Sequence, residues 1–167
     1  TRSFTVKNIP VPPDHVRPTI TINNAPASGS VVASLNDPIT GTASDADSGL
    51  RDVRLFLYRQ SDGMCWNGST WVSTFTQMTD AVTPATWSIG PMPSPGANPS
   101  TDLTDGIYAM VAAAYDNACN NKGETRSFVV DSSAPSDISF TKIGDVSNPV
   151  DNSVVSLLTP VHGTATD

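Results

Sequence analysis

Gly-Thr-Ala-Ser-Asp-Ala-Asp-Ser-Gly-Leu, residues 41–50, decides the fold, because its first five residues return as Gly-Thr-Ala-Thr-Asp at 163–167. A second pair of matching segments is TRSFTV at 1–6 and TRSFVV at 125–130. The two offsets, 122 (163 − 41) and 124 (125 − 1) residues, agree closely. The sequence therefore predicts a tandem repeat of about 120 residues.

This repeat divides the chain into four parts. We expect residues 1–6 to be the last strand of a preceding unit, and the proline-rich residues 7–17 to be a semi-rigid linker. Residues 18–131 then form one complete domain. Residues 132–167 hold a second linker and the first strands of the next unit.

The composition favours an all-β protein with many turns. Asp occurs fifteen times and Glu once, at Glu124, among 14 Pro and 11 Gly, a usage that suits turns rather than helices. The net charge of −7 and nine scattered basic residues argue against nucleic-acid binding. No apolar run approaches the roughly 18 residues of a membrane span. Few Lys and Glu among many Thr, Ser, Asn and Asp indicate an extracellular protein.

The pattern of apolar residues predicts short strands separated by turns. The segment 51–60 has apolar residues on both faces, so we expect a central strand that is covered on both sides. Residues 31–35 either continue the first strand or form a short extra one, and 90–102 form a long surface loop. The expected strands are 19–22, 31–35, 39–43, 51–60, 64–66, 70–72, 75–78, 87–89, 107–116 and 125–130, followed by 138–140 and 154–158.

Strands of this number and spacing are typical of an immunoglobulin-like sandwich of two antiparallel sheets. Tyr108 follows a turn at the start of a central strand, where a tyrosine corner would lie. Its alternative role is a core tyrosine without that hydrogen bond. Alanines farther along the same strand would let the opposing sheet approach closely.

Four segments together carry a resemblance to a known family. They are residues 41–50, the turns and tryptophans of 61–71, Asp-Gly-Ile-Tyr at 105–108 and Asp-Asn-Ala at 116–118. Over residues 18–131 the chain resembles the bacterial immunoglobulin-like (Big-type) tandem repeats of large secreted surface proteins and adhesins. The resemblance implies an extracellular, non-catalytic module, without naming a ligand.

The chain departs from the family pattern in three places. Cys65 stands where such repeats commonly have an aromatic or polar residue. Cys119 stands where a glycine usually follows Asp-Asn-Ala. The proline-rich loop 90–102 resembles an insertion.

The acidic loop predicts a calcium site. In an immunoglobulin-like topology Asp45 and Asp47 lie near Asp116 and Asn117, with Asp14 of the linker within reach. Several oxygen ligands from short loops suit Ca²⁺, which would stiffen the joint between units. The alternative is that the loop aspartates form Asx turns and stay solvated.

The two cysteines should lie at opposite ends of the sandwich. About eight strand residues at ~3.3 Å each separate Cys65 from Cys119 by roughly 26 Å, far beyond the ~7 Å between α-carbons that a disulfide allows. In a head-to-tail array Cys65 of one unit could instead reach Cys119 of its neighbour. Two free thiols, or a bond within the domain if the strand assignment fails, are the alternatives.

No catalytic motif occurs in the sequence. The two histidines, His15 and His162, fall in a linker and in a strand of different units, without a nucleophile beside them. We therefore expect a structural repeat of a stalk, adhesin or filament that stacks on neighbouring copies. The alternative is a carbohydrate- or protein-binding module that uses Trp66 and Trp71 as a stacking platform for surface glycans.

Overall fold

The computed structural model describes residues 14–80, 86–134, 137–143, 146–147 and 161–166. Two compact units follow one another, Thr1–Asp131 and Ser132–Asp167. The strands predicted at 1–6 and 154–158 and most of the linker 7–17 lie outside the described residues. None of the described residues forms a helix, so no helix among them could span a membrane.

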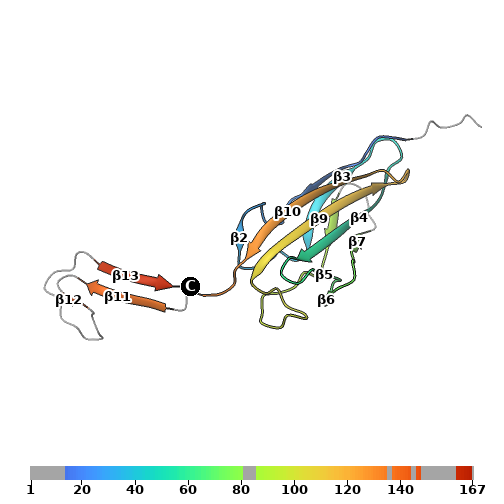
Figure 1. The fold of residues 1–167 in the computed structure, drawn as a ribbon. Helices are drawn as coiled ribbons and strands as arrows, with labels where there is room; N and C mark the ends of the chain where they lie inside the picture. The colour runs from blue at the N-terminus through green and yellow to red at the C-terminus, as the bar shows by residue number, and fades with distance from the viewer. Residues whose placement is uncertain (1–13, 81–85, 135–136, 144–145, 148–160, 167) are drawn as a thin grey trace, which may run out of the picture. The chain divides into compact units, whose positions relative to one another are not determined.

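The first unit is an all-β sandwich, as the composition predicts. One sheet has the order β1-β3-β8, and the other has the order β2-β10-β9-β4-β5-β6, with β7 also on β4 (Figure 1). The strands are β1 (Thr19–Ile22), β2 (Val31–Val32), β3 (Ile39–Ser44), β4 (Leu50–Arg59), β5 (Met64–Trp66), β6 (Trp71–Val72), β7 (Met78–Asp80), β8 (Thr86–Ile89), β9 (Gly106–Asp116) and β10 (Asn121–Val130).

The first part of the domain crosses from one sheet to the other. β1 pairs antiparallel with β3, whereas β2 pairs parallel with β10 at Val31↔Val129 and Val32↔Val130. Of the two alternatives for residues 31–35, the structure therefore has the short extra strand. β10 also begins four residues earlier than predicted, because Asn121 already pairs with Tyr115 of β9.

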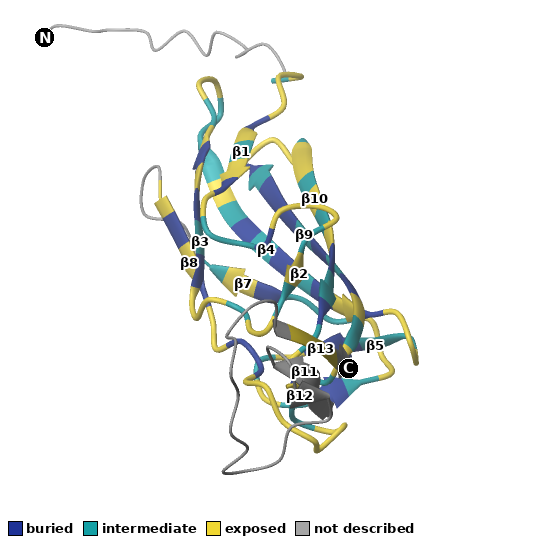
Figure 2. Ribbon diagram, turned by 90° about the vertical axis from the view of Figure 1, so that its left-hand side faces the viewer, coloured by how far each residue is buried: buried dark blue, intermediate teal, exposed yellow. Residues whose placement is uncertain are grey.

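The hydrophobic core lies between the two sheets. Along β4, Val53, Leu55 and Leu57 are fully buried, and they alternate with less buried residues, as Figure 2 shows. On β9, Met110 and Ala112 are equally buried, which confirms the predicted inward face of that strand. Each fully buried Leu or Ile side chain contributes about 1.5–3 kcal/mol through the hydrophobic effect.

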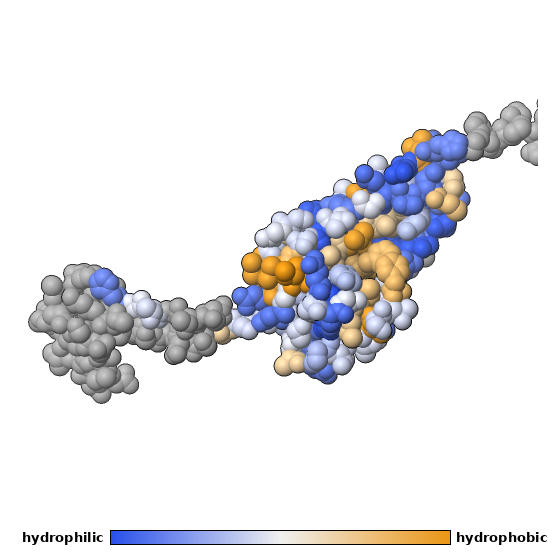
Figure 3. All heavy atoms as spheres, viewed as in Figure 1, coloured by the Kyte–Doolittle hydropathy of each residue, from blue (hydrophilic) through white to orange (hydrophobic). Residues whose placement is uncertain are grey.

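The outer face of β4 differs from the prediction. Phe56 is only half-buried and Tyr58 is exposed, so the expectation that both faces of this strand are covered was wrong. Phe56 stacks instead on Phe75, with 4.7 Å between the ring centroids. Apolar residues gather on the face of the seven-stranded sheet that Figure 3 turns to the viewer.

Three aromatic rings, those of Trp71, Tyr108 and Phe128, pack in a row in the core. Tyr108 donates its hydroxyl hydrogen to the carbonyl oxygen of Thr104 at 2.7 Å, which confirms the tyrosine corner. Its ring lies 5.7 Å from that of Trp71 and 6.0 Å from that of Phe128. Such aromatic pairs stabilise by ~0.5–1.5 kcal/mol beyond the area they bury.

The second unit is described by itself. It contains β11 (Asp137–Ile143), β12 (Val146–Ser147) and β13 (Val161–Thr166). The partners across β11 and β13 are Ile138↔Ala165, Ser139↔Thr164 and Phe140↔Gly163. The partners across β1 and β3 are Ile20↔Ala43, Thr21↔Thr42 and Ile22↔Gly41. Both pairs of strands therefore place a Gly-Thr-Ala segment in the same register against an antiparallel partner.

Gly41 is required by the packing of β3. A Cβ atom there would lie 2.0 Å from the carbonyl oxygen of Thr21 and 2.3 Å from a ring carbon of Trp87. Because one of these atoms is backbone, it cannot move aside without disturbing the β1–β3 pairing.

We predict that Gly41→Ala destabilises the protein by about 3 kcal/mol, because overpacking a tight core forces the backbone apart. Gly123→Ala is the matched control, since its Cβ would approach no atom closer than 3.6 Å. Urea unfolding followed by tryptophan fluorescence measures both free energies. Equal losses in the two variants would contradict the role given to Gly41.

Candidate metal centre

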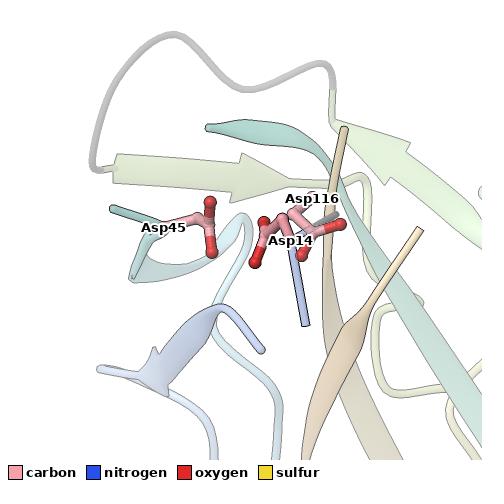
Figure 4. Close-up of side chains that lie close together, drawn as sticks. All are labelled: Asp14, Asp45 and Asp116. Atoms are coloured by element: carbon pink, nitrogen blue, oxygen red, sulfur yellow. The ribbon is translucent and has the colours of Figure 1, made fainter. Parts of the chain in front are cut away.

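Three carboxylates from distant parts of the sequence meet at one end of the sandwich. Asp14 precedes β1, Asp45 directly follows β3, and Asp116 is the last residue of β9. One oxygen atom from each lies within 4.8 Å of the others, and Figure 4 shows the side chains grouped together. Asp116 is fully buried, and the other two are half-buried.

The loop between β3 and β4 is folded by Asp45 itself. Its Oδ1 accepts hydrogen bonds from the backbone nitrogens of Ser48 at 3.0 Å and Gly49 at 2.8 Å. Gly49 has a φ of +78°, which few residues other than glycine adopt readily. The predicted Asx turn is therefore present, but it uses only Oδ1 and leaves Oδ2 for another partner.

Asn120 binds the carboxylate of Asp116 and the backbone of the segment that carries Asp14. Its backbone nitrogen donates to Asp116 Oδ1 at 2.7 Å, and its amide donates to Asp116 Oδ2 at 2.9 Å. The same amide donates to the carbonyl oxygens of Asp14 and Val16, both at 3.2 Å. Asp14 Oδ1 in turn accepts from the Val16 backbone nitrogen at 2.7 Å. This one side chain therefore ties the segment before β1 to the end of β9.

Two oxygens of the cluster, Asp14 Oδ2 and Asp45 Oδ2, are buried without a hydrogen-bond partner. Among the described residues, no Lys or Arg forms an ion pair with any of the three carboxylates. Negative charges within 4.8 Å of one another repel each other. A buried cluster of this kind is stabilised by a cation that it surrounds.

Asp14 keeps its negative charge well into the acidic range. The nearby Ser48 hydroxyl, and then the hydrogen bond that the Val16 backbone nitrogen donates to Oδ1, lower the pKa of Asp14 from its usual range. A carboxyl group whose pKa is lowered by folding stabilises the fold at pH values above the pKa that the group has in the unfolded chain. This stabilisation is lost as the pH falls through the lowered pKa of the folded state. Asp14 is therefore available as an anionic ligand at neutral pH.

The three carboxylates fit a hard cation. Ca²⁺ takes six to eight oxygen ligands in irregular arrangements, including carboxylates, backbone carbonyls and water. Asp14, Asp45 and Asp116 would supply the carboxylate ligands. The two unpartnered buried oxygens are the feature of the structure that matches such an ion most directly.

Two of the five predicted ligands have other roles. Asp47 is exposed and lies outside the cluster. Asn117 donates its amide hydrogens to the carbonyl oxygens of Ser48 at 2.9 Å and Gly49 at 3.1 Å. It therefore braces the β3–β4 loop, while the carboxylates that the structure groups together are those of Asp14, Asp45 and Asp116.

The cysteines lie where the sequence places them, at opposite ends of β9. Cys65 is the β-partner of Tyr58, which also pairs with Ala109, whereas Cys119 follows Asp116. Seven residues of β9 at ~3.3 Å each separate these levels by roughly 23 Å. Both are free thiols within this chain, with Cys65 buried and Cys119 exposed. The disulfide between successive units stays a prediction, and the burial of Cys65 weighs against it.

Trp66 and Trp71 face the core and not the solvent. They are 3% and 5% exposed, with 5.4 Å between their ring centroids. The indole nitrogens donate to the carbonyl oxygens of Pro91 and Asp102, both at 2.8 Å. The loop 90–102 therefore satisfies the buried indoles, and the predicted glycan-stacking platform at these tryptophans was wrong.

We predict that Asn120→Ala destabilises the protein by about 2–3 kcal/mol, because it leaves an oxygen of the buried Asp116 without its donor. Asn121→Ala is the control, since Asn121 is exposed on the neighbouring position of β10. Chemical denaturation measures the loss, and limited proteolysis near residue 14 checks whether the segment before β1 detaches. A loss below roughly 0.5 kcal/mol, the size of ordinary surface effects, would contradict the prediction.

No family model matches the chain, and no curated protein matches its sequence. The resemblance to bacterial immunoglobulin-like repeats therefore stays a prediction.

Proposed function

We propose that this chain is a non-catalytic structural repeat of an extracellular surface protein or filament, in which successive immunoglobulin-like units follow head to tail. The observation that carries the proposal is the register shared by the two units. Gly163 pairs with Phe140 as Gly41 pairs with Ile22, and the two residues that follow each glycine are also matched.

The shared register supports a repeat because it includes a position that is constrained in the first unit. Gly41 is the position where any side chain would strike both Thr21 and Trp87. Gly163 occupies the same register position in its own pair of strands. Units that begin with the same strand pairing and a glycine at the same position are what an array of similar domains requires. Among the described residues we find no nucleophile beside a base that would suggest a reaction. A non-catalytic role is therefore part of the proposal.

Calcium is the cofactor that we propose for the carboxylate cluster. Asp14 lies in the segment that leads into the domain, while Asp45 and Asp116 belong to the domain itself. An ion held by all three would fasten that segment to the ends of β3 and β9. In an extracellular stalk or adhesin, such an ion would make each unit stiffer and harder to unfold.

Electron microscopy of the native, full-length protein tests the repeat. We expect beads or filaments with an axial spacing on the order of 40 Å, because the 11 residues of β9 rise ~3.3 Å each and loops extend both ends. Isolated globular particles, without any periodic spacing, would contradict a head-to-tail array.

Calorimetry of the 167-residue chain tests the ion. We predict that free calcium at 100 times its dissociation constant stabilises the fold by about 2.7 kcal/mol, and that a chelator removes this gain. Asp45→Asn should abolish the response, because it removes a charged ligand while keeping an oxygen that can accept from Ser48 and Gly49.

Asp47→Asn is the matched control, since it removes the same charge outside the cluster. It should keep the full response to calcium. In chelator, Asp45→Asn should unfold at the same temperature as the parent or higher, because one repulsive charge is gone. An unchanged melting temperature of the parent protein in millimolar calcium and in chelator would eliminate the calcium site.

A further inference from the structure

An apolar pocket of about 520 Å³ opens on the outer face of the larger sheet. Its lining includes Phe56 and Tyr58 of β4, Ala109 and Val111 of β9, Cys65 of β5, and Phe75 before β7. The β-pairs Phe56↔Val111 and Tyr58↔Ala109 place four of these residues side by side. The pocket lies on the opposite side of β4 and β9 from the core, within the apolar area visible in Figure 3.

The pocket is aromatic and uncharged, although the protein carries a net charge of −7. Phe75 is 75% exposed and stacks on Phe56, so an extended aromatic surface faces the solvent. Farther along β4, the charged residues Arg54 and Asp52 pair with each other at 2.8 Å. An exposed apolar surface with polar residues beside it is a candidate interaction site.

We propose that this pocket binds the proline-rich segment 7–13, Lys-Asn-Ile-Pro-Val-Pro-Pro, of another copy of the chain. Proline-rich segments dock in aromatic-lined grooves, because their backbone is already extended and loses little entropy on binding. This segment contains prolines at positions 10 and 13, the spacing of such ligands, with Ile9 and Val11 as further apolar contacts. Its one charge, on Lys7, is opposite in sign to the net charge of the domain.

The segment of the same chain is too short to fill the pocket. Asp14 is held within 4.8 Å of Asp116, and Asp116 lies five to seven residues of β9, roughly 17–23 Å, from the level of the pocket. Residue 10 is four residues before Asp14 and extends at most ~14 Å from it. Even with the 4.8 Å between the two carboxylates added, residue 10 reaches roughly 19 Å, short of the far level of the pocket. Residues 10–13 can therefore fill the whole pocket only from a second copy. This contact deepens the proposed repeat function by linking one array to another, and it rests on that function.

Fluorescence anisotropy of a labelled, end-blocked peptide of residues 7–13 tests the contact on the 167-residue protein. We expect saturable binding with a dissociation constant on the order of 100 µM, since a short segment has few contacts. Phe75→Ser should weaken binding about tenfold or more. This variant keeps the fold, because Phe75 is a surface residue. Val31→Ser, at an exposed apolar residue outside the pocket, is the matched control and should bind like the parent.

A peptide with Pro10→Ala and Pro13→Ala is the matched control for the ligand, and it should bind at least tenfold more weakly. No saturable binding, equal binding of the two peptides, or equal binding to the Phe75→Ser protein would each overturn the proposal. Binding of the neutral dye N-phenyl-1-naphthylamine without peptide binding would also overturn it, in favour of a small apolar ligand. A failed peptide experiment with periodic beads still visible by electron microscopy would remove this contact and leave the repeat intact.

Discussion

The antiparallel pairing of β4 with β9 is the constraint on which the rest of the structure depends. It runs from Leu50↔Asp116 to Arg59↔Tyr108. Because side chains alternate across a strand, this single ladder creates two faces, one filled by the core and one carrying the apolar pocket. The end of this pairing at Leu50↔Asp116 also places Asp116 beside the β3–β4 loop, where the three carboxylates meet. Core, pocket and candidate metal centre are therefore three consequences of one register.

Charge and burial are balanced differently at the two ends of this ladder. At one end Arg59 is buried, lies over the ring of Trp71 at 4.6 Å, and pairs with Asp62 at 2.6 Å. At the other end Asp116 is buried beside two further carboxylates, and the described residues include no basic partner for them. A buried charge without an opposite charge is costly. That asymmetry is the physical reason to expect a cation at the second end and not at the first.

Hydrogen bonding explains why the acidic loop can serve two purposes. Asp45 uses one oxygen to fold its own turn and keeps the other buried and unpartnered. Asn117 supports this turn from the end of β9, and Asn120 supports the segment before β1. The carboxylate oxygens are thus positioned by hydrogen bonds that do not require an ion. A preorganised set of this kind loses little conformational entropy when a cation binds.

The sequence by itself determined the class of fold, the long central strands, the tyrosine corner and the meeting of Asp14, Asp45 and Asp116. These features follow from local turn chemistry, alternation and an immunoglobulin-like topology. The tertiary structure alone decided that Asn117 braces a loop, that Trp66 and Trp71 face inward, and that Phe56 and Phe75 form an exposed stacked pair. Alternation tells which residues share a face, but which face is covered depends on the other sheet and on loop 90–102, whose carbonyl groups bind the indoles.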